Sequence, residues 1–277
     1  MKILKSIRLV LACITVLAVT PTLAEDIQMG SVAMDIPVEM VKRMGVLTKY
    51  LSAKSELSIT FRASPNLDSA VDDLGAGRTQ IAYLTPVAYL QAREKYGVVP
   101  LVAPLTNGQP TFALVIGVKN DSPFKSVDDL KGKRFAFGDE KALLQKASVE
   151  AMGIKVTDFS KIAYLKHYDN IAKAVLNGDF DAGILKDTVA EDFKSKGIRV
   201  LKSSEQLPSY VFAVDKNTPP ETVGKLKAAF LALKRGTPAH NATLDGFNKG
   251  YDGFVATSDS AYDIIRKLTA PYKAGTR

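Results

Sequence analysis

Several polar side chains of this sequence come at or soon after the ends of short apolar runs that have the length and composition of buried strands. They bring together a hydroxyl, a phenol, two carboxylates, two ammonium groups and an imidazole. The residues are Thr85, Tyr89, Asp139, Lys141, His167, Lys186 and Asp187. In open α/β sheets, ligands bind beyond the carboxyl ends of the strands, so we expect these side chains to line a cleft. An imidazole can donate to an anion in either protonation state, and free amides at a helix N-terminus also favour negative charge. The sequence therefore predicts a binding site for a small anionic ligand.

Most of these residues also have a purely structural interpretation. Asp139 and Asp187 stand at predicted helix starts, where an aspartate commonly caps the first backbone amides. His167 is either a cap of the helix that follows it or a solvated loop residue. Lys141 fits a solvated surface lysine, and Tyr89 fits a side chain packed on a neighbouring helix. The residue types alone leave both interpretations open.

Two arginines and the second histidine are weaker candidates. The guanidinium groups of Arg62 and Arg78 are suited to bidentate contacts with an oxyanion, although Arg78 is expected at the surface. His240 lies in a predicted turn at 238–241 and is expected to be exposed.

Catalysis is poorly supported by the residue inventory. The chain has two histidines and one cysteine, Cys13, which lies in the N-terminal apolar segment. A Gly-x-Ser-x-Gly nucleophile motif, a His-Glu-x-x-His metal motif and a phosphate-binding P-loop are all missing from the sequence. No strip of basic and aromatic residues suggests nucleic acid. We therefore expect a binding protein with no enzymatic activity, no cofactor and no bound metal.

Residues 1–24 have the pattern of a secretory signal. Three cations precede an apolar run at 9–19 that is short for a membrane span: Lys2, Lys5 and Arg8. The segment Thr22-Leu23-Ala24 places small residues at the positions that signal peptidase reads, which predicts cleavage after Ala24, export to the periplasm and no stable membrane insertion afterwards. An uncleaved N-terminal anchor, or a lipoprotein modified at Cys13, are the alternatives. The chain after Ala24 carries 34 Lys+Arg against 29 Asp+Glu, a net charge of +5, and about 250 residues are enough for two lobes.

Helical and strand patterns alternate along the chain, which argues for an α/β fold with a parallel-rich sheet. In the first part, we predict helices at 36–53, 66–74 and 86–95 and strands at 57–61, 81–84 and 98–103. In the second part, we predict helices at 142–152 and 171–176 and strands at 161–165, 182–185 and 198–201. Helices running to about residue 234 and over 261–268 follow. The predicted apolar stripe of the first helix consists of Val38, Val41, Met44, Leu47 and Leu51.

The stretch 111–143 predicts how two lobes are joined. A strand at 111–118 leaves the first lobe, a short helix at 126–130 follows, and a strand at 134–138 opens onto a new helix. A strand at 210–214 would return the chain. We therefore predict one lobe formed by 25–116 and 210–277, and a second formed by 117–209.

A weak internal repeat supports two similar halves. Residues 77–86 align with 178–187 at a constant offset, and both segments contain a glycine, an apolar strand, a polar turn and a helix start. The turns at Thr85 and at Lys186 would then be matching lips of one cleft, one from each lobe.

Four segments resemble the PhnD-like branch of periplasmic substrate-binding proteins, which serve ABC importers of phosphate, phosphite and phosphonates. They are 77–89, 121–139 (DSPFKSVDDLKGKRFAFGD), 167–183 (HYDNIAKAVLNGDFDAG) and 253–268. The resemblance implies a two-lobed type II periplasmic-binding fold, with mixed sheets flanked by helices and two crossover hinge strands, that closes on a small anion. It also implies an ABC permease as partner, and ligand contacts at His167 and Asp187.

The sequence departs from that family at the site. The family has a run of hydroxyl residues after Gly138-Asp139, where this chain has Glu140-Lys141-Ala142-Leu143. Leu67 and Leu84 stand where the family has tyrosines. The expected function is capture of a phosphonate-like oxyanion for an ABC importer. The alternative is a degenerate binding protein that acts as a periplasmic sensor or accessory partner of a histidine-kinase ectodomain or a redox system.

Overall fold

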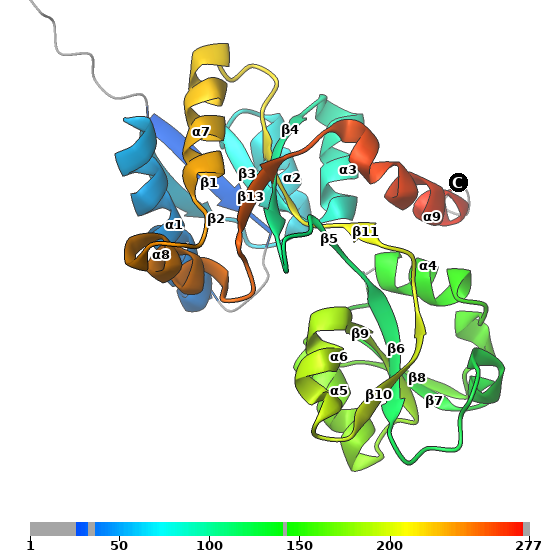
Figure 1. The fold of residues 1–277 in the computed structure, drawn as a ribbon. Helices are drawn as coiled ribbons and strands as arrows, with labels where there is room; N and C mark the ends of the chain where they lie inside the picture. The colour runs from blue at the N-terminus through cyan, green and yellow to red at the C-terminus, as the bar shows by residue number, and fades with distance from the viewer. Residues whose placement is uncertain (1–25, 33–36, 141–142, 274–277) are drawn as a thin grey trace, which may run out of the picture.

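The computed structural model describes residues 26–32, 37–140 and 143–273. The predicted signal segment 1–24, its cleavage site after Ala24 and the candidate residue Lys141 lie outside the described residues. The described chain forms two α/β lobes joined by a narrow ribbon (Figure 1).

The first lobe is built on a six-stranded sheet. In spatial order its strands are β13 (Gly253–Ala256), β4 (Val99–Leu105), β12 (Val211–Val214), β3 (Ile81–Leu84), β1 (Asp26–Ser31) and β2 (Ser58–Ala63). β1 is parallel to β2 and β3, whereas β12 is antiparallel to β3 and β4. Successive side chains of β3 enter different cores, Ile81 and Tyr83 on one face and Ala82 and Leu84 on the other. Because both faces are covered, the strand is apolar at every position.

Helices cover both faces of this sheet. One face carries α1 (Pro37–Ser55), α7 (Pro220–Ala232) and α8 (Pro238–Asn248), and the other carries α2 (Leu67–Gly75) and α3 (Pro86–Tyr96). Local caps fix two of the predicted starts, because Asn66 accepts from the backbone N–H of Ser69 at 2.9 Å and Thr85 from that of Ala88 at 3.2 Å.

The predicted apolar stripe of α1 is wrong at its first turns. Val38 is 73% exposed and Val41 is 55% exposed. The buried stripe consists of Met40, Met44, Leu47 and Leu51. These positions follow the spacing of four, three and four residues that keeps side chains on one helix face, and Val38 and Val41 lie off that line.

The second lobe is built on a five-stranded sheet. Its spatial order is β10 (Ile198–Ser203), β6 (Leu114–Lys119), β9 (Ala182–Lys186), β7 (Arg134–Phe137) and β8 (Lys161–Tyr164). Its helices are α4 (Leu143–Ala151), α5 (Tyr168–Asn177) and α6 (Asp187–Lys194), with short 3₁₀ turns η1 (Val127–Leu130) and η2 (Val156–Asp158). β7 is parallel to β8 and β9, and β6 is antiparallel to β9 and β10.

A two-stranded ribbon connects the lobes. Its strands are β5 (Thr111–Phe112) and β11 (Leu207–Pro208), which are antiparallel. The predicted boundary between residues 116 and 117 falls inside β6, whose residues from Leu114 onward pair with β9 of the second sheet. The sheets therefore change a few residues earlier than the sequence pattern suggested.

The elements that the sequence did not predict include β1, β13 and α8. His240 lies in α8 rather than in an exposed turn, and its ring packs edge-on against Tyr50 at 5.5 Å between centroids.

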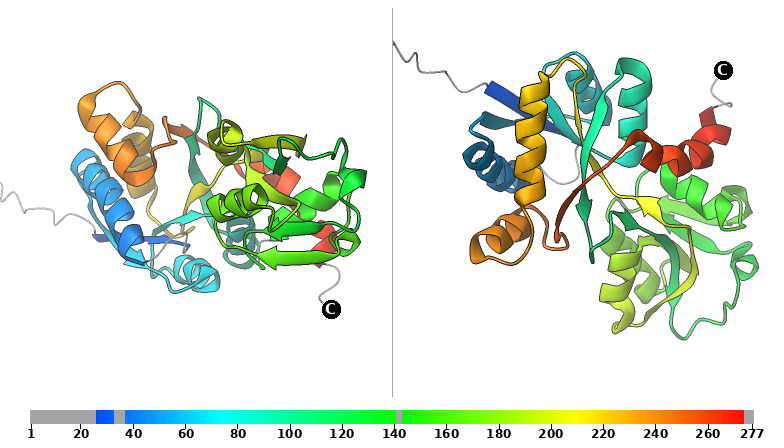
Figure 2. Two further views of the ribbon diagram at one scale, coloured as in Figure 1. Left: turned by 90° about the horizontal axis from the view of Figure 1, so that it is seen from below. Right: turned by 45° about the horizontal axis from the view of Figure 1, so that its top comes forward.

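The last helix reaches from one lobe to the other. After the 3₁₀ turn η3 (Asp259–Tyr262), α9 (Asp263–Lys273) packs on α4, and Tyr272 donates to a carboxylate oxygen of Glu150 at 2.5 Å. Figure 2 shows α9, in red, beside the green α4. Among the described helices, none has the length and apolar character needed to cross a membrane.

Candidate functional site

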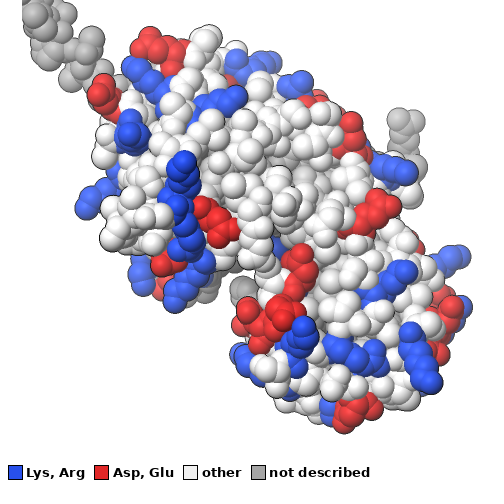
Figure 3. Space-filling view, viewed as in Figure 1, with Lys and Arg blue, Asp and Glu red and all other residues white. Residues whose placement is uncertain are grey.

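The C-terminal ends of parallel strands from both lobes meet the connecting ribbon. In the second sheet, Leu114 at the start of β6 pairs with Lys186 at the end of β9. In the first sheet, Val211 at the start of β12 pairs with Leu84 at the end of β3. The ribbon thus enters each sheet at the edge where its parallel strands end, and Figure 3 shows the surface hollowed between the two lobes. Loops that follow β3, β7, β8 and β9 therefore border this junction.

Asp187 uses its carboxylate to hold the backbone. Its side chain accepts from the N–H of Ala113 at 2.8 Å and from the N–H of Thr188 at 2.8 Å, and its own N–H donates to the carbonyl of Ala113 at 2.9 Å. These bonds tie the start of α6 to the chain that leaves β5. Asp187 is thus the first residue of α6 and not its N-cap, and its structural role is this tie to Ala113; ligand contact by Asp187 stays a prediction.

Lys186 is a half-buried lysine at the end of β9, on the sheet edge that meets the ribbon. Its ammonium lies 5.2 Å from the centroid of the Phe112 ring, in the connecting ribbon. Within the described parts of the chain, no carboxylate forms an ion pair with it. Burial lowers the pKa of Lys186, and the negative charge of Asp187 opposes that change more weakly. A desolvated ammonium of this kind is a ready partner for an anion.

The turn between β7 and α4 is filled by a side chain. The amide oxygen of Gln145, itself buried, accepts from the N–H of Gly138 at 2.8 Å. This bond fixes the orientation of the amide, so its NH₂ group donates to the hydroxyl of Tyr168 at 3.2 Å. A Cβ on residue 138 would lie 2.7 Å from the same NH₂ group, so a larger residue there would require the Gln145 side chain to shift. The Gly138 amide, a possible anion donor, is thus already satisfied.

Tyrosines continue this network into the first lobe. Burial raises the pKa of Tyr168, and the neighbouring charges of Tyr210 and Asp187 raise it further. Tyr210 precedes β12 in the first lobe, and its ring lies 5.3 Å from that of Tyr83 between centroids. The Tyr83 and Tyr251 hydroxyls are hydrogen bonded at 2.5 Å. Tyr168 begins α5 after β8 of the second lobe and Tyr210 lies between the ribbon and β12 of the first, so the two residues border the junction from opposite lobes.

His167 and Asp139 are exposed residues of the second-lobe loops. His167 occupies the position before α5, and its side chain does not cap the helix. Asp139 follows the end of β7 at the same edge. Both lie at strand ends, as expected, and ligand contact by either residue stays a prediction.

Thr85 and Tyr89 are engaged within the first lobe. The Thr85 hydroxyl caps α3, and the ring of Tyr89 is fully buried against Tyr262, 4.7 Å away between centroids. The Tyr89 hydroxyl donates to Asp259 at 2.5 Å. The packing alternative is therefore realised for Tyr89.

The two candidate arginines both lie against one buried carboxylate. Arg78 forms an ion pair with Asp73 at 2.6 Å, and Arg62 approaches the other oxygen of Asp73 at 3.7 Å. Both guanidinium groups therefore interact with a carboxylate of their own lobe.

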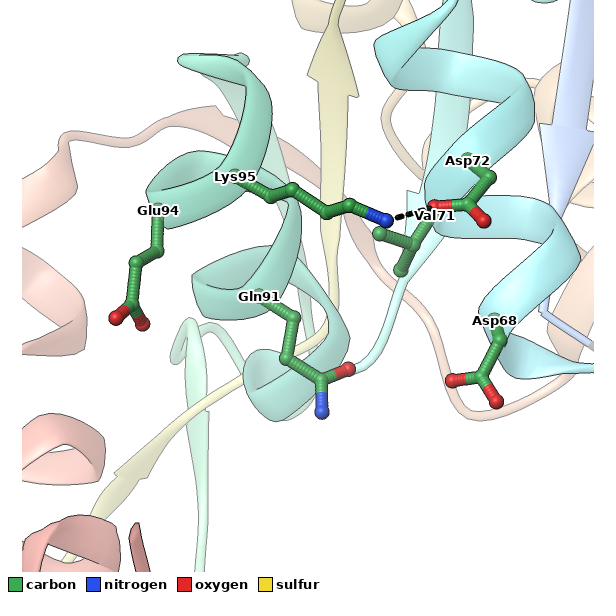
Figure 4. A pocket seen from close by; sticks show the side chains of 6 residues that line it. All are labelled: Asp68, Val71, Asp72, Gln91, Glu94 and Lys95. Atoms are coloured by element: carbon green, nitrogen blue, oxygen red, sulfur yellow. Dashed lines mark hydrogen bonds and ion pairs between the residues drawn. The ribbon is translucent and has the colours of Figure 1, made fainter. Parts of the chain in front are cut away.

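One surface groove lies away from this junction, between α2 and α3, and another lies beside it, between α6 and β10. The groove between α2 and α3 has a volume of about 540 Å³ and is bordered by three carboxylates and one lysine (Figure 4). Its side chains are Asp68, Val71, Asp72, Gln91, Glu94 and Lys95. Lys95 donates to Asp72 at 3.0 Å, so this groove does not suit an anion. A second groove, of about 600 Å³, runs between α6 and β10.

The described residues contain no cluster of three or more side chains that could hold a metal ion. Sequence reasoning missed Gln145, Tyr168 and Tyr210. Tyr168 is next to the candidate His167, and Tyr210 directly precedes a predicted strand. A search of the residues on both sides of each predicted strand would have included them. No local signal marks Gln145.

Comparisons with known proteins agree with this architecture. The family model of the periplasmic substrate-binding protein of phosphonate ABC transporters matches residues 29–262. The phosphate-import protein PhnD of Mycolicibacterium smegmatis is 22% identical over 270 residues, which cover 90% of this chain and 83% of that protein. The structure of PhnD1 from Prochlorococcus marinus with methylphosphonate superposes with a TM-score of 0.74 at 18% identity, covering 90% of this chain and 98% of the other. A binding-protein component of an ABC phosphonate transporter from Pseudomonas aeruginosa gives a TM-score of 0.71 at 17% identity, covering 90% and 87%.

Proposed function

The chain belongs to the family of periplasmic substrate-binding proteins of phosphonate ABC transporters, and we propose that it captures a small oxyanion between its lobes for an ABC importer. The fold is the two-lobed type II periplasmic-binding fold, as predicted. Members of this family bind a ligand and pass it to a permease without chemical conversion. The chain is accordingly a binding protein rather than an enzyme.

The observation that carries the proposal is the half-buried ammonium of Lys186 at the lobe junction. It lies where the parallel strands of the second sheet end, and no carboxylate of the described chain forms an ion pair with it. A desolvated cation gains more from an anion than a solvated one, because water competes less for its charge. PhnD1 of Prochlorococcus marinus was crystallised with methylphosphonate, and the M. smegmatis relative imports phosphate, so an oxyanion is the natural first ligand class to test.

Two further parts of the proposal come from the sequence. We propose the two lobes that the sequence predicts, 25–116 with 210–277 and 117–209, with the boundary moved from residue 116 to the β5–β11 ribbon. Residues 1–24 are proposed to direct export, with cleavage after Ala24. Mass spectrometry of the protein recovered from the periplasm would show whether its first residue is Glu25.

Titration calorimetry of the chain from Glu25 onward tests the central claim. The panel is phosphate, phosphite, methylphosphonate, methanesulfonate and acetate. We expect saturable one-to-one binding of at least one of these oxyanions. Loss of all heat in every titration, with folded protein, would contradict the proposed function.

A sensor role is the second candidate, and the filled turn between β7 and α4 favours it. Because Gln145 already accepts from the Gly138 N–H, that amide is not available to an anion. A sensor would bind a histidine-kinase ectodomain, whereas an importer component would bind the reconstituted permease. Pull-down of each candidate by the purified protein separates the two roles.

A further inference from the structure

We infer that Lys186, Tyr168 and Tyr210 form the anion-binding subsite and that it selects a singly charged oxyanion, a carboxylate or a sulfonate, over a doubly charged phosphonate. This inference rests on the proposed function and specifies its ligand. Neither the family match nor the relatives assign these three residues.

The first step concerns the donors that remain available. Tyr168 accepts from Gln145, so the proton of its hydroxyl is left for another acceptor, and the described chain provides none. Tyr210 is half-buried, and the described chain likewise gives its hydroxyl no hydrogen bond. Lys186 adds three N–H donors. The subsite therefore offers one positive charge and two neutral hydroxyls, contributed by both lobes.

The second step concerns the Gly138 N–H, a hydrogen-bond donor that is already occupied. In the turn between β7 and α4, the Gly138 N–H points at the side-chain oxygen of Gln145, 2.8 Å away. An anion that used this amide would have to displace a buried side chain and leave its amide group without partners, which costs free energy. The ligand charge must then be met chiefly by Lys186.

The third step concerns the charges along the same strand ends. Asp187 follows Lys186 directly, and Asp139 follows the neighbouring strand β7. These strand ends therefore carry one ammonium and two carboxylates, and neither carboxylate forms an ion pair with Lys186. A single negative charge on the ligand pairs with the ammonium, whereas a second one would face the carboxylates at a partly desolvated site. Single charge is therefore favoured.

Matched ligands test the charge preference. Methanesulfonate and methylphosphonate have similar size, and titration calorimetry at a pH where the phosphonate carries two charges compares them on the wild-type chain. We expect methanesulfonate or acetate to bind on the order of 10-fold more tightly. Tighter binding of the doubly charged phosphonate overturns the inference and leaves the proposed function intact.

Two variants test the residues. Lys186→Met is expected to weaken binding of the preferred anion roughly 10- to 100-fold, whereas the matched control Lys194→Met, an exposed lysine of α6, leaves affinity unchanged. Gln145→Ala frees the Gly138 N–H and is expected to improve methylphosphonate binding relative to methanesulfonate. Unchanged affinity in Lys186→Met, or no shift in Gln145→Ala that circular dichroism shows to be folded, overturns the assignment. If the wild type binds no oxyanion of the panel, the proposed function fails and this inference fails with it.

Discussion

Replacing Asp187 should destabilise the junction between the lobes far more than its position on a short surface helix suggests. Asp187→Ala removes the acceptor of the Ala113 N–H, and Ala113 is only 5% exposed, so water cannot easily take its place. An unsatisfied buried N–H costs about 1–3 kcal/mol, and loss of a negative charge from the first helical turn adds about 0.3–1 kcal/mol. We therefore expect a loss of about 1–4 kcal/mol in the free energy of unfolding.

Urea denaturation followed by circular dichroism measures this loss. With a slope of about 2 kcal/mol per molar, the midpoint should fall by roughly 0.5–2 M. Asp187→Asn keeps one side-chain oxygen for the Ala113 N–H and should lose less. Asp192→Ala, an exposed aspartate of the same helix, is the matched control and should change stability by less than about 0.5 kcal/mol. If Asp187→Ala were as mild as the control, the structural role assigned to this carboxylate would be refuted.

Three other perturbations test individual contacts of the structure. Tyr89→Phe removes the hydrogen bond to Asp259 but keeps the buried ring, so the free energy of unfolding should fall by about 1–2 kcal/mol, and an unchanged melting temperature would speak against that bond. The Arg134 guanidinium holds the pKa of Asp181 below its ordinary value of 3.8, so Asp181 stabilises the fold above that pH and loses this effect as the pH falls through it. The stability advantage of wild type over Asp181→Asn should therefore shrink in acid, and a pH-independent difference would contradict the pairing. Tyr272→Phe should speed hydrogen exchange in α9, because its bond to the second lobe is lost, and equal exchange rates would argue that the bond does not hold the helix.

Local patterns predicted much of the fold because their causes are local. The strand at 81–84 and the helix that begins at Pro86 were recognisable from an apolar run followed by a Thr-Pro turn, and the structure has both. The internal repeat correctly predicted a strand, turn and helix start at Lys186–Asp187. The error at Val38 arose because two stripes of similar hydrophobicity run along the same helix, and only packing decides between them.

Elements that depend on distant partners were harder to predict. β13 is a four-residue strand that begins at Gly253 and pairs with β4, nearly 150 residues earlier in the chain. α8 did carry a local signal, since Thr237 caps it by accepting from the N–H of His240 at 3.2 Å and Pro238 begins it. The same two residues also favour a turn, because threonine and proline are common both in turns and at helix starts.

In the candidate site, too, features with a local cause could be predicted and contacts between distant residues could not. Strand ends predicted where Lys186 and Asp187 would lie, but not that Asp187 would bind the backbone. The contribution of Gln145 depends on the path of the turn before α4. The positions of Tyr168 and Tyr210 on the two sides of the junction depend on how the ribbon places the two lobes. No periodicity or motif in the sequence indicates such tertiary contacts.

A crystal structure of the chain grown with methanesulfonate or acetate tests the central claim most directly. The account predicts electron density for the anion at the lobe junction, within hydrogen-bond distance of the Lys186 ammonium and the Tyr168 and Tyr210 hydroxyls. Density for the anion only in the groove between α2 and α3 or the groove between α6 and β10, with the junction free of ligand, would contradict it.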